Sequence, residues 1–417
     1  NIFFLKTFFR VLKILTVNLM IYFTSLLKFK KLTPTKGLKK EVLIVSHLIN
    51  RKHLKSNEDF YLGKFEKTLN KIDKSFFKLM INHTPHNSVL LNSMNKSMNS
   101  LILANYLEFS AEISIFCKKI LTFFELIHIY FQKKINFNQL YHLAISLFSS
   151  STSFTIRINY QIINYVKLIK PNYCIFTYEG YPWERMCIHG IKSVNPKIKC
   201  IGYQHTPVTD SHNAIFNILP GNFNPTYIWC SQKTSFQILK ENIKTKKKIV
   251  HLIGNLKSIK FKKTKLNDNK TFLVIPEGIY SECENLFRIS LILANKYKNF
   301  KFIWRVHPVI EFNKVLESLN LKIKMLPKNV IISNSKFEND ISKSTYVIYK
   351  GSAAVLKSVI MGNFPLYYQF KKERNFDPIK YYFKRKNYFK NEIDFIEKVR
   401  RAQSKIYKNS FKKKISI

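Results

Sequence analysis

The feature that most constrains the fold is a regular alternation of two kinds of segment. From residue 41 onward, short runs of β-branched and aromatic residues alternate with longer helical stretches. The clearest example is a pair of successive helix-then-strand units, with the strands at 173–177 and 199–203. Strands that alternate with helices pair in parallel, because each helix carries the chain back to the same end of the sheet. The sequence therefore predicts an α/β fold.

The predicted strands fall into two sets. The first set lies at 42–45, 77–81, 173–177, 199–203, 227–230 and 249–253. The second set lies at 272–275, 302–306, 330–332, 346–349 and 364–367. We therefore expect two doubly wound, Rossmann-like domains at 41–256 and 271–390, which face each other across a cleft where such folds bind ligands. The basic, polar stretch 257–270 is the predicted linker, and 391–417 is a predicted basic helix.

Two further segments are apolar. Residues 1–40 are apolar and basic, but their longest charge-free run, 14–27, is shorter than the roughly 20 residues that a spanning helix needs. An interfacial helix on a membrane and a buried N-terminal helix both remain open for this segment. The apolar region at 101–131 is a predicted helical insert, either a pair that covers the sheet or a second membrane-facing surface.

The formal net charge of +45 raises the question of nucleic acid binding. The excess is almost entirely lysine spread evenly along the chain, and arginine and aromatic residues form no recognisable binding module. We therefore do not expect nucleic acid as a partner. No Asp-x-Asp sequence occurs, and six cysteines form no Cys-x-x-Cys pair, so we expect no bound metal, reduced thiols and a cytoplasmic location.

Functional residues in such folds follow the strand ends, and five predicted turns there carry polar residues or glycine. These turns are 178–180, 204–207, 276–278, 305–308 and 350–352. Gly351 and Ser352 precede a predicted helix, whose unpaired N–H groups attract phosphate, and Gly278 allows close backbone approach. Arg305 and His307 can pair with a phosphate oxygen or contact a base.

Transfer of a group to a hydroxyl would also need a side chain that takes the proton from the attacking hydroxyl. His205 and Glu179 are the two candidates for this base, and the choice between them remains open. Glu179 is alternatively a partner for Arg185. The candidates for binding the acceptor are Tyr178, Gln204 and Arg185. Without a metal, charge on the donor phosphates would be neutralised by Arg305, Lys350 and helix N-termini.

Four of these segments resemble motifs of known enzymes. The turn from Gly202 to Pro207 resembles a histidine-containing turn of the CDP-glycerol glycerophosphotransferases. Arg305-Val306-His307-Pro308 is similar to the Arg-x-His-Pro turn of that group and to the His-Pro motif of bacterial sialyltransferases and capsule Kdo transferases. The segment from Asp340 to Ser352 resembles their phosphate-binding segment, and Pro276-Glu277-Gly278 resembles their acidic-glycine turn.

The resemblance implies a GT-B fold and an inverting, metal-independent glycosyltransferase of surface or capsular polysaccharide synthesis. Its implied donor is a nucleotide sugar, with a CMP or CDP type favoured, and its acceptor is a glycan or lipid-linked glycan. The donor would bind Glu277, Gly278, Arg305, His307, Lys350, Gly351 and Ser352. No separate cofactor is expected, and peripheral contact with the inner face of the cell membrane is anticipated. Two alternatives remain: a sugar-nucleotide epimerase of the same fold, and a non-catalytic basic protein that binds nucleic acid or a membrane surface.

Overall fold

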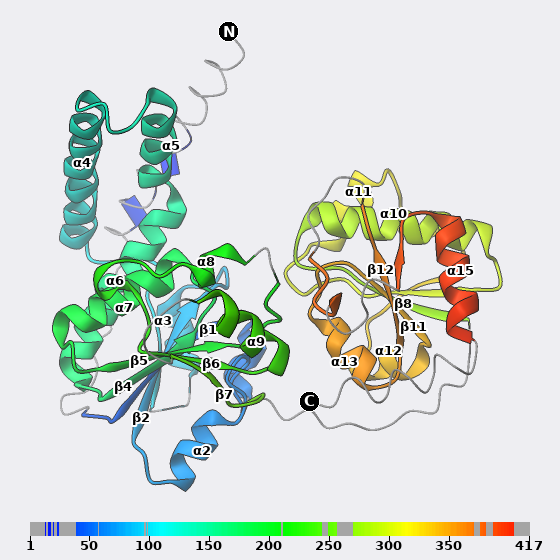
Figure 1. Ribbon diagram of the computed structural model, residues 1–417, viewed down its shortest axis with the longest axis horizontal. Coiled ribbons are helices and arrows are strands. Elements are labelled where there is room, and N and C mark those ends of the chain that lie inside the picture. The colour runs from blue at the N-terminus through cyan, green and yellow to red at the C-terminus, as the bar shows by residue number, and fades with distance from the viewer. Residues whose placement is uncertain are drawn as a thin grey trace. The chain divides into compact units, whose positions relative to one another are not determined.

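The structure is a computed structural model whose chain divides into two compact units (Figure 1). It describes residues 39–56, 58–95, 97, 99–209, 212–243, 249–256, 270–370, 376–380 and 387–403, with isolated positions between 13 and 24. The first unit comprises Asn1–His205, Ala214–Ser231 and Ile243–Ser258. The second comprises Thr206–Asn213, Gln232–Asn242 and Ile259–Ile417.

The first unit is built on a parallel sheet of seven strands in the order β3-β2-β1-β4-β5-β6-β7. The strands are β1 (Val42–Leu48), β2 (Phe76–Asn82), β3 (Ser100–Ile102), β4 (Tyr173–Thr177), β5 (Lys199–Gln204), β6 (Tyr227–Cys230) and β7 (Val250–Leu252). The strands are apolar along most of their length because both faces of a parallel sheet are covered. The order reverses direction between β1 and β4, which makes their carboxyl ends the natural ligand site of this sheet.

Helices connect these strands. They are η1 (Arg51–Lys55), α2 (Phe65–Lys71), α3 (Ser88–Met94), α4 (Phe109–Phe131), α5 (Phe137–Phe148), α6 (Ser150–Ile169), α7 (Pro182–Val194), α8 (Asn213–Phe216), η2 (Gly221–Phe223) and α9 (Lys233–Asn242). Local chemistry sets several of the boundaries. Asn136 and Gln139 form a capping box that starts α5, and α6 ends at Lys170 in the left-handed conformation.

The second unit contains a parallel sheet of six strands in the order β10-β9-β8-β11-β12-β13. These are β8 (Thr271–Ile275), β9 (Lys301–Trp304), β10 (Val330–Ile332), β11 (Tyr346–Tyr349), β12 (Phe364–Tyr368) and β13 (Tyr388–Phe389). Its helices are α10 (Tyr280–Lys296), α11 (Phe312–Ser318), η3 (Ile323–Met325), α12 (Phe337–Lys343), α13 (Ala354–Ile360) and α15 (Glu392–Gln403).

Both faces of the second sheet are buried. Phe272 and Trp304 belong to the apolar cluster on one face, and Leu273 and Tyr349 belong to the cluster on the other. Helix α15 is part of this core, because Phe395 on it contacts Phe272 at a ring separation of 5.2 Å. The prediction of a parallel α/β fold in both halves of the chain is confirmed.

Some boundaries differ from those predicted. The apolar region 101–131 is not helical from its start, because residues 100–102 form β3 beside β2 and the helix begins at Phe109. The stretch 82–100, for which no element was predicted, contains α3. All but the last residue of the linker at 257–270, most of the segment 1–40 and the end of the helix at 391–417 lie outside the described residues. No helix among the described residues has the length and hydropathy to cross a membrane.

Candidate active site

Histidine side chains gather at the carboxyl edge of the first sheet. His47 lies near the end of β1, His83 directly follows β2, and Thr177 ends β4. The Nδ1 atom of His47 is 2.8 Å from Nε2 of His83, and its Nε2 atom is 2.9 Å from Oγ1 of Thr177. A continuous hydrogen-bonded chain therefore crosses three neighbouring strands at the point where the strand order reverses.

The environment keeps this imidazole pair neutral. Burial, together with smaller effects of the nearby rings of His83 and His205, lowers the pKa of His47 to about 3. Burial also lowers the pKa of His83. A neutral imidazole has one donor and one acceptor nitrogen, so the two rings can bond in sequence without like-charge repulsion. Among the described residues, no three His, Cys, Asp or Glu side chains are arranged to hold a metal ion.

Aromatic side chains surround the histidines. The ring of Tyr61 lies 5.2 Å from that of His47 and 4.7 Å from that of His205, and Trp183 lies 5.0 Å from His47. Burial raises the pKa of Tyr61 to about 12, and the negative charges of Glu179 and Asp59 add to this effect. Tyr61 therefore keeps its phenolic proton at neutral pH and can act as a hydrogen-bond donor.

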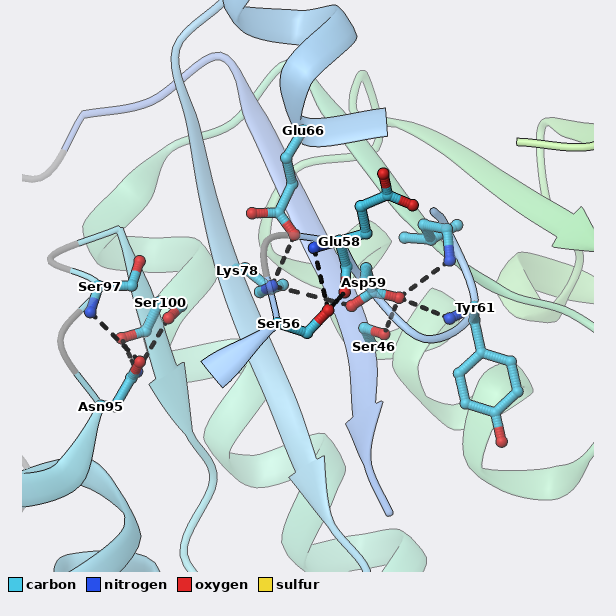
Figure 2. Close-up of polar contacts among 11 residues, drawn as sticks. Ser46, Ser56, Glu58, Asp59, Tyr61, Glu66, Lys78, Asn95, Ser97 and Ser100 are labelled. Carbon is cyan, nitrogen blue, oxygen red and sulfur yellow. Dashed lines mark hydrogen bonds and ion pairs between the residues drawn. The ribbon is translucent and has the colours of Figure 1, made fainter. Parts of the chain in front are cut away.

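A buried carboxylate holds the loop that carries Tyr61 (Figure 2). Oδ1 of Asp59 accepts hydrogen bonds from the Ser46 hydroxyl at 2.9 Å and from the backbone N–H groups of Tyr61 and Leu62 at 2.8 and 2.9 Å. Oδ2 lies 3.8 Å from the ammonium group of Lys78. Because Ser46 immediately precedes His47, one carboxylate fixes both the strand and the loop that supply the site.

Both predicted base candidates lie at this edge. His205 follows β5 and Glu179 follows β4, which is its neighbour in the sheet. His205 acts electrostatically on His47, and Glu179 acts electrostatically on Tyr61. Both candidates therefore lie near the same group of residues. The structure therefore brings these candidates together, and their catalytic roles stay predictions.

The three predicted acceptor-binding residues lie deeper. Tyr178, Gln204 and Arg185 are 1%, 0% and 5% exposed, respectively. The guanidinium of Arg185 lies 5.6 Å from the centre of the Tyr178 ring and donates to the carbonyl oxygens of Ala214 and Asn217, each at 2.7 Å. These contacts hold the neighbouring loop, and acceptor binding by the three residues stays a prediction.

Glu184, rather than Arg185, supports the turn that carries Glu179. Its buried carboxyl group accepts hydrogen bonds from the backbone N–H of Glu179 at 2.9 Å and of Tyr181 at 2.8 Å. Burial raises the pKa of Glu184 to about 8, against the opposing effect of these N–H groups. The turn after β4 is therefore held by a carboxyl group from the helix that follows it.

Sequence reasoning missed His47, His83 and Tyr61. The rule that functional residues follow strand ends could have found His83, because it comes directly after β2. His47 lies two residues beyond the predicted strand 42–45, and β1 continues to Leu48. No comparable signal marks Tyr61, which reaches the site through the Asp59 loop.

In the second unit, the predicted donor-binding residues follow three strands that are neighbours in the sheet, β9, β8 and β11. They are Glu277, Gly278, Arg305, His307, Lys350, Gly351 and Ser352. The closeness of these turns is evident at two glycines. A Cβ atom added to Gly351 would lie 2.3 Å from Oε2 of Glu277, and one added to Gly278 would lie 3.1 Å from the ring of His307.

A carboxyl group joins two of these turns. Oε1 of Glu282, on α10, accepts hydrogen bonds from the backbone N–H of Glu277 at 3.2 Å and from that of Gly351 at 3.3 Å. The Gly351 N–H, assigned from the sequence to a donor phosphate, is thus bonded to a carboxyl oxygen in this structure. A phosphate at this position would have to replace or share that contact.

Arg305 is also engaged within the protein. Its Nη1 atom donates to Oδ2 of Asp340 and to the carbonyl oxygen of Ser335, each at 2.7 Å. Asp340 is buried, and the Ser333 hydroxyl donates to the same oxygen at 2.5 Å. These contacts fix the guanidinium, while phosphate binding by Arg305 stays a prediction.

The remaining basic groups of these turns are partly desolvated. Burial lowers the pKa of His307, and burial lowers that of Lys350, while the nearby carboxyl groups oppose both shifts. His307 is therefore a neutral hydrogen-bonding group at neutral pH. Lys350 gains more from an anionic ligand than an exposed lysine would, because its charge is less well solvated.

The protonation of Glu282 should be visible in the stability of the protein. Burial raises its pKa from 4.5 to about 7, with a further effect of the negative charge of Glu277. Between these pH values the folded state binds more protons than the unfolded state, so this group makes stability fall as pH rises. We expect Glu282→Gln to reduce that fall, measured by urea unfolding at about pH 5 and about pH 8.

Glu284→Gln, on the same helix, is the control and should keep the wild-type dependence. An unchanged pH dependence in Glu282→Gln would show that Glu282 is ionised in the folded state throughout this range.

Comparisons with known proteins identify the fold. No family model matches the chain, and no curated protein sequence matches it. Solved structures do match. A provisionally assigned UDP-N-acetylglucosamine 2-epimerase from Listeria monocytogenes has a TM-score of 0.54 at 10% identity, covering 90% of this chain and 91% of its own. The glycotransferase of kitacinnamycin has a TM-score of 0.52 at 9% identity, covering 90% and 95%.

A third match is the UDP-GlcNAc 2-epimerase from Neisseria meningitidis bound to UDP-GlcNAc. It has a TM-score of 0.50 at 13% identity, covering 90% of this chain and 94% of its own. At this level of identity the likeness concerns the fold, and it spans both units rather than one. The chain therefore has the GT-B fold of two Rossmann-like α/β units.

Proposed function

We propose that this protein is an enzyme that acts on a nucleotide-activated sugar. The turns after β8, β9 and β11 supply the groups that a nucleotide diphosphate or monophosphate needs: two basic side chains, a neutral histidine and glycines that admit close approach. The raised pKa of Glu282 supports this proposal, because a carboxyl group that is partly protonated near neutral pH repels an anionic ligand less than an ionised one. Glu277 can accept hydrogen bonds from sugar or ribose hydroxyls.

The reaction that the first unit supports is glycosyl transfer with inversion to a glycan acceptor. The observation that carries this proposal is the placement of His205, Glu179 and Tyr61 at one sheet edge beside the neutral His47 and His83 pair. His205 would take the proton of the acceptor hydroxyl, and Glu179 is the alternative base. Tyr61 would donate to an acceptor oxygen. A CMP or CDP donor and a surface glycan acceptor are proposed from the motif resemblance alone.

Epimerisation of the sugar nucleotide is a second candidate. It is favoured by the fold comparisons, in which UDP-GlcNAc 2-epimerases are prominent. Epimerisation needs no acceptor, because the configuration of a sugar carbon changes by removal and return of a proton. The two reactions therefore differ in whether a second substrate is required.

One experiment separates the two reactions. The protein is first screened by thermal shift against UDP-, CDP- and CMP-activated sugars, because a ligand specific to the folded state raises the melting temperature. Each stabilising donor is then incubated in deuterated water with and without a mixture of glycan acceptors. Transfer predicts nucleotide release that depends on acceptor, and epimerisation predicts deuterium in the sugar ring without acceptor.

The donor site has its own test. His307→Ala is expected to weaken binding of the stabilising donor roughly tenfold in calorimetry, through loss of one hydrogen bond to a charged group. His142→Ala, an exposed histidine on α5, should leave donor binding unchanged. Equal affinity of His307→Ala and the wild type would place the donor elsewhere.

A further inference from the structure

The helical hairpin of α4 and α5 presents an apolar surface that projects from the first unit (Figure 1). The buried residues of α4 all lie in its first half, α5 has none, and no residue from 120 to 149 is buried. Large apolar side chains there are well exposed: Leu121 (63%), Phe124 (61%), Phe131 (75%) and Phe137 (66%). Large exposed apolar side chains gathered on one hairpin indicate a site of interaction.

The base of the hairpin is held firmly. Arg157 on α6 makes two hydrogen bonds to the Glu112 carboxylate on α4, at 2.6 and 2.9 Å, and both residues are buried. The buried Lys119 donates to the Ser153 hydroxyl one turn earlier on α6. Beyond Lys119, the last buried residue, α4 continues to Phe131 for about 18 Å, given the rise of a helix. The exposed part is therefore an extension on a rigid support.

The tip of the hairpin combines aromatic and basic residues. Phe131 ends α4 and Phe137 begins α5, and the exposed Lys133 and Lys134 lie in the turn between them. Lys133 adopts a left-handed conformation with φ of 57°, and the capping box at Asn136 fixes the start of α5. Along the chain, one aromatic residue therefore precedes the two lysines and another follows them.

The charge of the hairpin has one sign over most of its length. From 118 to 149 the exposed lysines are Lys118, Lys133 and Lys134, and the one carboxylate is Glu125. Exposed aromatic rings beside lysines suit the boundary between headgroups and acyl chains, where rings enter the apolar layer and ammonium groups meet phosphates. This charge favours an anionic lipid surface over a second copy of a chain with net charge +45.

We propose that the tip of this hairpin, residues 130–137 with the adjoining apolar faces of α4 and α5, inserts into the headgroup region of an anionic membrane. The contact is peripheral, with Phe131 and Phe137 buried in the lipid boundary and Lys133 and Lys134 at the phosphates. This inference does not rest on the sugar chemistry proposed above, because it concerns α4, α5 and the turn between them and uses none of the strand-end residues.

Vesicle flotation of the full-length protein tests the proposal. Wild-type protein should float with vesicles of phosphatidylcholine and phosphatidylglycerol and much less with phosphatidylcholine alone. Phe131→Glu with Phe137→Glu should lower the floated fraction on anionic vesicles by roughly tenfold or more, because two aromatic side chains no longer enter the apolar layer. Lys133→Glu with Lys134→Glu should also lower the floated fraction on anionic vesicles. The difference from the wild type should become smaller as salt is added.

Matched controls come from the second unit. Ile393 on α15 is 75% exposed, as Phe131 is, so Ile393→Glu repeats the change of an exposed apolar residue to a charge. Lys322→Glu with Lys324→Glu repeats the loss of two neighbouring exposed lysines. Both controls should float nearly as the wild type does.

Several results would overturn the proposal. Wild-type protein that does not float, or hairpin variants that float as well as the wild type, would show that the tip does not bind lipid. Unchanged flotation with a lowered melting temperature would show that the hairpin packs within the protein. Conversion of a dimer to a monomer by Phe131→Glu with Phe137→Glu, without wild-type flotation, would assign the surface to a second copy.

Discussion

Replacing Arg157 by methionine should lower the free energy of unfolding by about 3–5 kcal/mol, as expected when one partner of a buried ion pair is removed. The Glu112 carboxylate is 1% exposed, and in wild-type protein it accepts hydrogen bonds from Nε and Nη2 of Arg157 and from the backbone N–H of Leu107. Without Arg157, the hydrogen bond that remains to this carboxylate within the described part of the chain is that from Leu107. Urea unfolding, followed by circular dichroism, measures the loss.

Two further variants separate a buried charge from a simple loss of packing. Glu112→Leu combined with Arg157→Met removes both charges and should recover most of the lost stability. Arg288→Met breaks an ion pair to Glu284 on the surface of α10, where the arginine is 52% exposed, and should cost less than about 1 kcal/mol. A loss in Arg157→Met no larger than in Arg288→Met would mean that the Glu112 pair contributes little.

The second large effect is expected in catalysis. His205→Ala should lower the turnover number about 10² to 10⁴-fold, the usual contribution of a positioned general base. Its ring lies 4.7 Å from that of Tyr61 at the edge where β4 and β5 end. Acceptor-dependent release of nucleotide, measured with saturating donor, gives the turnover number.

Glu179→Gln distinguishes the two candidate bases. If His205 is the base, Glu179→Gln should cost much less than His205→Ala, because the amide keeps the shape and the hydrogen bonds of the side chain. If Glu179 is the base, the order of the two effects reverses. Donor binding by calorimetry should be unchanged in both variants, since both residues lie in the first unit. Weakened donor binding would contradict this division of roles.

The alternation of apolar runs and helices was sufficient to predict most of both sheets. After an exposed first residue, strands such as β4 and β5 are buried on both faces, so local composition and tertiary environment agree. Agreement fails at short or edge elements. β3 and β13 contain three and two residues, and such runs become strands only because a neighbouring strand is available.

The candidate site could be predicted only in part, because some of its residues are polar side chains inside a buried strand. His47 and Ser46 are polar residues inside a buried strand, and the sequence alone suggests that the strand ends before them. Ser46 is accommodated because Asp59 accepts its hydroxyl, and His47 because His83 and Thr177 bond to both of its nitrogens. The hydrogen bond between Glu282 and Gly351 was likewise not predictable, because these two residues are 69 positions apart in the chain. Such pairings depend on tertiary contacts that no local pattern encodes.

The bond between His47 and Thr177 also bears on how the first unit folds. Residues that pair between β1 and β2, such as Val42 and Phe76, are 34 positions apart, whereas His47 and Thr177 are 130 positions apart. Closing so long a loop costs chain entropy before any contact compensates for it, so pairing of β1 with β4 should be a late step. The imidazole chain can therefore exist only once the central strands have joined. The ring N–H resonances of His47 thus report completion of the sheet during refolding, separately from the helix signal that α4 to α6 contribute earlier.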